Sequence, residues 1–126
     1  FDLGYLIDDK LILLGRAGRM FNRRGLNVFA EEIENTVKKL PYIIEAAVIG
    51  QLQDDRSHEL FLAYTCSGGF QNNNYNKFIF KHLASHLQAT KIPQRLKEFE
   101  NLPRTNFGKI DFKALARKFD EEAYMV

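Results

Sequence analysis

The sequence predicts an α+β fold, in which a small antiparallel sheet is flanked by about three helices and preceded by a β-hairpin. Two observations predict this class. Short runs rich in apolar, β-branched and aromatic residues alternate along the chain with segments of helical period. The 126 residues, 45% of them hydrophobic and 27% charged, suffice for one packed core, and they are too few for two well-formed domains.

Two hairpins are expected at the N-terminal end. Residues 5–14 are apolar on both sides of Asp8-Asp9-Lys10, which predicts two short strands joined by a polar turn. Residues 19–29 are basic and rich in turn formers, so a second hairpin should close at Gly25.

The middle of the chain should hold a helix and two strands. Residues 30–40 carry apolar side chains at helical spacing, with glutamates in the first turns and Pro41 after the last. The apolar, β-branched runs at 43–49 and 60–66 are predicted as buried strands. We expect them to pair antiparallel across the polar loop 51–59.

The last part of the chain should add two helices and an extended segment. Residues 67–74 read as a surface loop, a helix is expected over 75–87, and an extended piece over 96–102. Asp111 is positioned to cap a final helix. The apolar stripe of that helix is Phe112, Leu115, Ala116 and Phe119.

The charge balance and the cysteine content exclude several classes of protein. With 18 basic against 16 acidic residues, the net charge is +2, so no global field calls for nucleic acid as a partner. No apolar run is long enough to span a membrane. The single Cys66 cannot form an internal disulfide, which favours the cytoplasm. Because the chain begins at Phe1 within structured-looking sequence, we expect it to be a fragment.

The most informative segment is Leu-Pro-Arg-Thr-Asn-Phe-Gly-Lys-Ile-Asp at residues 102–111. Lys109 follows Gly108 in a turn-like loop, from which a compact ammonium with rotatable donors can reach a phosphate group. Taken as a bare dipeptide, Gly-Lys is more often an exposed turn before a capped helix. The remaining segments are therefore needed to interpret it.

Four segments together resemble the C-terminal domain of the adenylate-forming superfamily, which comprises acyl-CoA synthetases, the adenylation domains of nonribosomal peptide synthetases, and luciferases. They resemble the last motif of the large N-terminal domain, the hinge-and-loop motif, the strand after it and the terminal lysine motif, at residues 2–5, 15–34, 40–50 and 102–111. The resemblance covers nearly the whole chain.

This resemblance implies an AMP-forming acyl-CoA synthetase, which activates a carboxylic acid with ATP to acyl-AMP and then transfers the acyl group to CoA. Lys109 matches the catalytic lysine of the first step, and its loop includes Arg104, Thr105 and Gly108. ATP with Mg²⁺ would be bound mainly by a large N-terminal adenylation domain of the same polypeptide. The isolated fragment is therefore expected to be inactive.

The resemblance also divides the chain and implies residues for the nucleotide. Residues 1–15 would be the tail of the large domain with the hairpin leading to the hinge, and 16–126 the mobile lid domain. Asp2 matches the acidic residue that grips the ribose hydroxyls, and Arg16 matches an arginine near the ribose and hinge. Gly18 occupies the hinge position, where the family usually has Asp or Lys.

The loop 23–27 matches the segment that lines the pantetheine path in the thioester-forming state. Gly25 lets the backbone come close to that arm, whereas Arg23 and Arg24 either meet CoA phosphates or solvate a turn. Asn27 stands where many peptide-synthetase domains carry arginine. This version of the loop is more similar to acyl-CoA ligases.

Two alternatives of different class stay open. Within the superfamily, the domain would load a carrier protein or belong to an enzyme that stops at acyl-AMP. In another class, it would be a noncatalytic module that binds anions or nucleic acid. That module would be built on Arg16, Arg19, Arg23 and Arg24.

The other candidate groups have structural interpretations. His82 and His86 have metal-ligand spacing on a helix but no third ligand nearby, so we expect surface residues and no metal site. Cys66 is expected to be a buried structural thiol. Glu32 and Glu34 should stabilise the start of a helix. Five aromatic residues are expected in the core, namely Phe78, Phe80, Phe99, Phe112 and Phe119.

Overall fold

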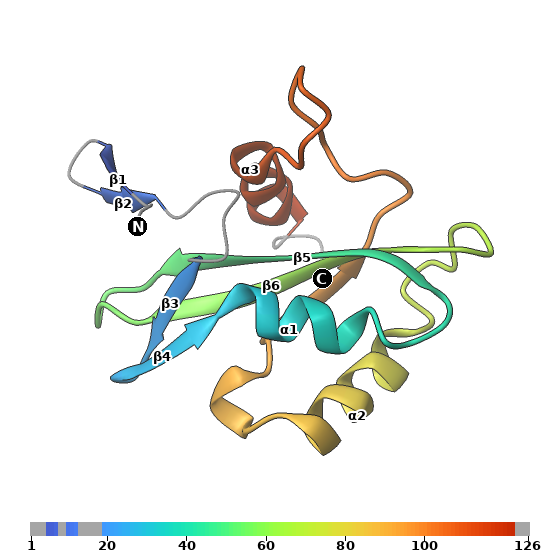
Figure 1. Cartoon of the computed structure of the whole chain (residues 1–126), viewed down its shortest axis with the longest axis horizontal. Helices are drawn as coiled ribbons and strands as arrows, with labels where there is room; N and C mark the ends of the chain where they lie inside the picture. The colour runs from blue at the N-terminus through green and yellow to red at the C-terminus, as the bar shows by residue number, and fades with distance from the viewer. Residues whose placement is uncertain (1–4, 8–9, 13–18, 123–126) are drawn as a thin grey trace.

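The centre of the fold is a three-stranded sheet in the order β5-β6-β7 (Figure 1). The computed structural model describes residues 5–7, 10–12 and 19–122. Strands β5 (Ile43–Leu52) and β6 (His58–Cys66) pair antiparallel, as predicted. Strand β7 (Arg95–Glu98) pairs with β6 in parallel, so the sheet is mixed. The connection from β6 to β7 crosses over through a helix, which returns the chain in the same direction.

Helices cover both faces of this sheet. Figure 1 shows α1 (Ala30–Val37) and α2 (Asn76–His86) on one face and α3 (Phe112–Glu122) on the other. Because side chains alternate along a strand, β6 contributes Leu62 and Tyr64 to the first core and Phe61 and Ala63 to the second. The central strand is therefore buried on both sides, and the predicted α+β class is confirmed.

Two hairpins precede the sheet, as the sequence predicts. Strands β1 (Tyr5–Ile7) and β2 (Lys10–Ile12) pair antiparallel, and residues 8 and 9 of their turn lie outside the described part of the chain. Strands β3 (Met20–Arg23) and β4 (Leu26–Phe29) form the second hairpin. Each hairpin is a two-stranded sheet of its own.

The predicted helices are present with shifted ends. Helix α1 stops at Val37, and a tighter turn follows in which the Leu40 N–H donates to the Val37 carbonyl at 3.0 Å before Pro41. Helix α3 begins after Asp111, whose Oδ1 accepts the Ala114 N–H at 3.0 Å, so the predicted cap is confirmed. A short 3-10 helix, η1 (Ala89–Lys91), leads into β7.

The expectation that Phe78 and Phe80 belong to the core is wrong. They are 60% and 50% exposed, whereas Phe99 and Phe119 are buried. The buried side chains of α2 are Ile79 and its neighbour one turn on, Leu83, and residues next to Ile79 in sequence point away from that stripe. In the described part of the chain, no helix is long and apolar enough to cross a membrane.

Candidate functional site

The lysine loop, residues 103–111, is a narrow hairpin-like loop between the sheet and α3. Its base is an antiparallel bridge between Arg104 and Ile110. The Thr105 N–H donates to the Lys109 carbonyl at 2.7 Å, and the Gly108 N–H donates to the Thr105 carbonyl at 3.0 Å. Gly108 has φ +82°, in the left-handed region that favours glycine. The backbone that carries Lys109 is thus fixed by its own hydrogen bonds.

The side chains at the end of this loop point into solvent. Lys109 is exposed, and among residues 19–119, whose side chains the structure describes, its ammonium has no hydrogen-bond or ion-pair partner. Phe107 is 89% exposed. A rigid loop that carries an unpaired cation provides a positioned point charge for an anionic ligand.

Arg104 anchors the lysine loop to the sheet. Its Nη1 donates to the Gly108 carbonyl at 3.1 Å, and its guanidinium pairs with the Glu45 carboxylate on β5. The Asp111 N–H donates to the Pro103 carbonyl at 2.8 Å. Arg104 therefore stabilises the loop from within, whereas the Lys109 ammonium has no bonding partner among the described side chains.

The turn at Gly25 closes the β3–β4 hairpin on the other side of the domain. Arg24 has φ 54° and Gly25 has φ 88°, the left-handed pair that a tight two-residue hairpin turn requires. A Cβ at Gly25 would meet no described heavy atom within 4 Å. The Gly25 N–H donates to Asn22 Oδ1 at 2.9 Å. The turn thus presents bare backbone to an open surface.

The two arginines beside Gly25 differ in their surroundings. Arg23 is half-buried, and its Nε and Nη1 donate to the carbonyls of Thr90 and His58 at 3.2 and 3.0 Å. Arg24 is exposed at the tip. Arg23 therefore ties the hairpin to η1 and β6, and Arg24 is the one that faces solvent.

Sequence reasoning missed a buried ion pair between Arg19 and Glu34. Arg19 Nη2 lies 2.5 and 2.6 Å from the two Glu34 carboxylate oxygens, and the guanidinium stacks over the Phe112 ring at 4.4 Å from its centroid. Arg19 also donates to the Val48 carbonyl, and Glu34 accepts the Val48 N–H. Val48 lies on the edge strand β5, so the pair occupies backbone groups that would otherwise be open.

This pair corrects the predicted roles of both residues. Glu34 is not a residue of the helix start: it is buried one turn after the buried Ala30, at i+4, which places it on the buried stripe of α1. Arg19 is committed to Glu34 and is only 7% exposed, so it cannot form part of a surface for nucleic acid. Glu32 lies on the exposed side and pairs with Lys91 at 3.0 Å.

The surroundings of the two histidines and the cysteine fit structural roles and not catalytic or metal-binding ones. His82 Nε2 lies 2.9 Å from the Thr36 carbonyl, and His86 is exposed. Among the described residues, no three metal-ligating side chains gather in one place. Cys66 is buried, and burial raises the pKa of its thiol to about 11. A thiol with that pKa is a poor nucleophile at neutral pH.

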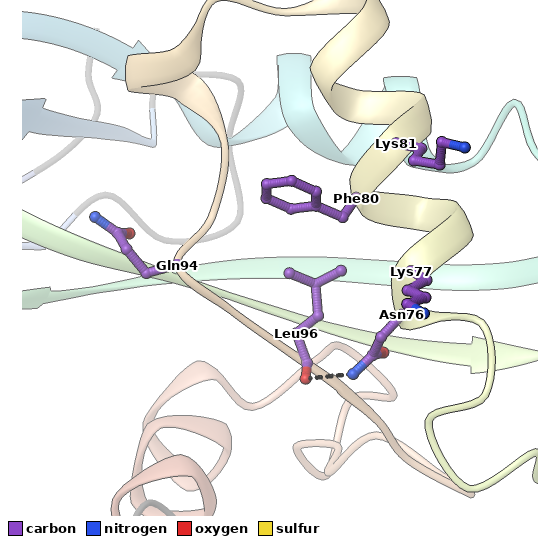
Figure 2. A pocket seen from close by; sticks show the side chains of 6 residues that line it. All are labelled: Asn76, Lys77, Phe80, Lys81, Gln94 and Leu96. Atoms are coloured by element: carbon purple, nitrogen blue, oxygen red, sulfur yellow. Dashed lines mark hydrogen bonds between the residues drawn. The ribbon is translucent and has the colours of Figure 1, made fainter.

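An open groove lies between α2 and β7 (Figure 2), and Figure 1 shows α2 on the other side of the sheet from the lysine loop. It is lined by Asn76, Lys77, Phe80, Lys81, Gln94 and Leu96. Figure 2 shows Phe80 projecting from α2 toward the groove, Lys81 extending away from it, and Asn76 Nδ2 donating to the Leu96 carbonyl at 3.1 Å. None of the predicted site residues lines this groove.

The structure thus separates two groups of predicted site residues. Figure 1 shows the lysine loop beyond α3 on one side of the sheet and the β3–β4 turn on the other. Asp2, Arg16 and Gly18 lie outside the described residues. The lysine loop, which carries the exposed Lys109, and the β3–β4 turn, which carries the exposed Gly25, therefore lie on opposite sides of the three-stranded sheet.

This chain belongs to the family of AMP-binding enzyme C-terminal domains, whose model matches residues 32–109. The matched range ends at Lys109. The resemblance to the C-terminal domain of adenylate-forming enzymes is confirmed at the level of the family.

Particular relatives belong to more than one kind of ligase. The chain is 36% identical over 111 residues to the vibriobactin-specific 2,3-dihydroxybenzoate-AMP ligase of Vibrio cholerae, covering 87% of this chain and 20% of that protein. It is 32% identical over 113 residues to a probable 2-succinylbenzoate–CoA ligase of Mycobacterium tuberculosis, covering 90% and 29%. The chain thus spans less than a third of the length of these relatives.

The fold agrees with a solved acyl-CoA synthetase. A fatty acyl CoA synthetase of Mycobacterium tuberculosis superposes with a TM-score of 0.70 at 26% identity, covering 92% of this chain and 23% of the other. This chain is thus similar to one part of a larger enzyme.

Proposed function

We propose that this chain is the C-terminal domain of an AMP-forming acid–thiol ligase of the acyl-CoA synthetase type. In the first half-reaction a carboxylate oxygen attacks the α-phosphorus of ATP, and pyrophosphate leaves. In the second, the sulfur of CoA attacks the acyl carbonyl carbon, and AMP leaves. The observation that carries the proposal is the Lys109 ammonium, which is unpaired among the described side chains and held on a fixed loop, opposite the open turn at Gly25.

Lys109 would serve the adenylation step. Negative charge is shared among the attacking carboxylate, the α-phosphate and the leaving pyrophosphate as that step proceeds. An ammonium held in place by the loop stabilises this charge without first reorganising. Because Arg104 already braces the Gly108 carbonyl, the loop would enter the nucleotide site as a preformed unit.

Gly25 would serve the thiol step. The pantetheine arm of CoA is long and thin, and a backbone turn without a side chain allows it to pass closely. Arg24, exposed beside Gly25, would be the group that meets CoA phosphates, while Arg23 holds the hairpin in place. The domain would swing between the two half-reactions, so that the two exposed sites act in turn.

Residues outside the described part complete the proposal. Asp2 and Arg16 would lie by the ribose of ATP, and Gly18 would be the hinge. Residues 1–15 would form the tail of the large domain and 16–126 the mobile lid. That large domain, on the same polypeptide, would bind the acid and most of ATP with its Mg²⁺.

The alternative within the family is an enzyme that loads a carrier protein or stops at acyl-AMP. The names of the two relatives favour neither reading, because one is an AMP ligase and the other a CoA ligase. Asn27, in the loop that contains Gly25, stands where many peptide-synthetase domains carry arginine. It therefore favours CoA over a carrier protein as the thiol acceptor. Assaying the enzyme that carries this domain with CoA and with carrier thiols separates these cases.

The test of the proposal is a split between the half-reactions. In the enzyme that carries this domain, Lys109→Ala should lower acid-dependent exchange between pyrophosphate and ATP by about 100-fold. Formation of thioester from supplied acyl-adenylate should stay within about twofold. Lys113→Ala, which removes an exposed lysine four residues further on, is the matched control and should change neither rate. Equal losses in both half-reactions with Lys109→Ala would refute the role of the lysine.

A further inference from the structure

A chain of hydrogen bonds runs from the sheet to the Gly25 turn through Asn22. The Asn22 backbone N–H donates to Nδ1 of His58, the first residue of β6, at 3.0 Å. The Asn22 side chain accepts the Gly25 N–H at Oδ1 and donates from Nδ2 to the Arg56 carbonyl at 3.1 Å. His58 is thus connected to the turn through a single intervening residue.

The His58 ring is held so that it can accept this bond. Its ring packs edge-on against Phe21, with centroids 5.4 Å apart, and the side chain is half-buried. Burial lowers the pKa of His58 below its usual value, so the ring is neutral at neutral pH. Nδ1 of a neutral imidazole whose proton lies on Nε2 is an acceptor. The ring therefore fixes the direction of the Asn22 N–H.

The hairpin needs this external support. Strands β3 and β4 have four residues each, and their pairing does not continue into the three-stranded sheet. An isolated two-stranded hairpin is marginally stable at best. Val28 of β4 is buried in the core and Phe21 of β3 packs against it, while hydrogen bonds to β6 and its neighbours orient the turn at the far end of the hairpin.

We propose that His58 is a positioning residue for the thiol half-reaction. Through Asn22 it holds the Gly25 turn in the orientation that admits the pantetheine arm. The inference rests on the proposed function of the Gly25 turn. It adds His58 to the residues that serve the thiol step. His58 lies 33 positions after Gly25 and on a different strand, and its imidazole would touch no reacting atom.

The test compares variants at His58 in the enzyme that carries this domain. His58→Leu removes the acceptor and should slow thioester formation from supplied acyl-adenylate by about tenfold, because displacements of about 1 Å can cost up to about 100-fold. His58→Asn places an amide oxygen near the position of Nδ1 and should restore most of that rate. Adenylation should remain within twofold in both variants. His86→Leu, at an exposed histidine, is the matched control and should change neither step.

Two further variants make every outcome decisive. If His58→Leu also loses adenylation because it fails to fold, Asn22→Ala tests the connection at its other end: it keeps the bond from the Asn22 N–H to His58 and removes the exposed side-chain bonds to Arg56 and Gly25. Asn22→Ala should slow the thiol step, and Asn22→Asp, which keeps the acceptor for the Gly25 N–H, should slow it less.

Gly25→Leu distinguishes a failure of the positioning role of His58 from a failure of the proposed role of the Gly25 turn in the thiol step. If Gly25→Leu impairs thioester formation while His58→Leu and Asn22→Ala do not, the positioning role is overturned and the function stands. If Gly25→Leu itself leaves CoA kinetics intact, the turn is not on the thiol path, and both fail. Equal rates for His58→Leu and His58→Asn would also overturn the positioning role, since the accepting atom would then have no effect.

Discussion

Removing the Glu34 carboxylate should destabilise this domain severely. Arg19 and Glu34 are 7% and 6% exposed, and three further partners depend on them: both backbone groups of Val48 and the ring of Phe112. Glu34→Ala leaves the guanidinium buried without a counter-charge and the Val48 N–H without an acceptor. Breaking a buried pair in this way costs about 3–5 kcal/mol, a large share of the total of about 5–15 kcal/mol for a typical domain.

Urea unfolding followed by circular dichroism measures this loss, because the chain has no tryptophan to report by fluorescence. Glu32→Ala is the matched control: Glu32 is on the same helix and pairs with Lys91 at the surface, so its loss should cost at most about 1 kcal/mol. The double variant Arg19→Met/Glu34→Leu should be more stable than Glu34→Ala. A cost for Glu34→Ala no larger than that for Glu32→Ala would refute the reasoning.

Three further predictions concern stability and reactivity. Because burial lowers the pKa of His58, the folded state binds fewer protons than the unfolded chain. Stability should therefore fall as the pH drops below about 6.5, and His58→Asn should flatten that part of the stability profile. Gly50→Ala should cost about 1–3 kcal/mol in urea, because its Cβ would lie 2.4 Å from the Phe21 ring, whereas Gly68→Ala should cost little. Cys66 should resist iodoacetamide at pH 8 in the native state and react on unfolding, and rapid native labelling would contradict its burial.

Local sequence signals predicted most of the elements. The turn at Gly25 and the cap at Asp111 depend on residues within a few positions of each other, so their chemistry is readable along the chain. The parallel pairing of β7 was not predicted, because it depends on the path of the crossover. The exposure of Phe78 and Phe80 was missed because their hydrophobicity was weighed without their position beside Ile79 on α2.

The candidate site was predictable where contiguous motifs carry it. The loop of Lys109 contains Gly108, and Gly108 and Gly25 both have positive φ. Both loops are recognisable from adjacent residues in the sequence. The Arg19–Glu34 pair spans 15 positions and the Asn22–His58 bond spans 36, so neither leaves a pattern in the local sequence. A signal for Glu34 did exist, since it falls on the apolar stripe of its helix.

The central claim is that one domain serves two half-reactions from two opposite sites. The most direct test measures the rates of both half-reactions in two variants of the enzyme that carries this domain, Lys109→Ala and Gly25→Leu. Gly69→Leu controls for strain and bulk, because Gly69 has φ +93° and an equally open surrounding. The account predicts crossed losses: adenylation falls with Lys109→Ala alone, and thioester formation falls with Gly25→Leu alone. If both variants lose the same half-reaction, the two sites do not act in turn and the account is wrong.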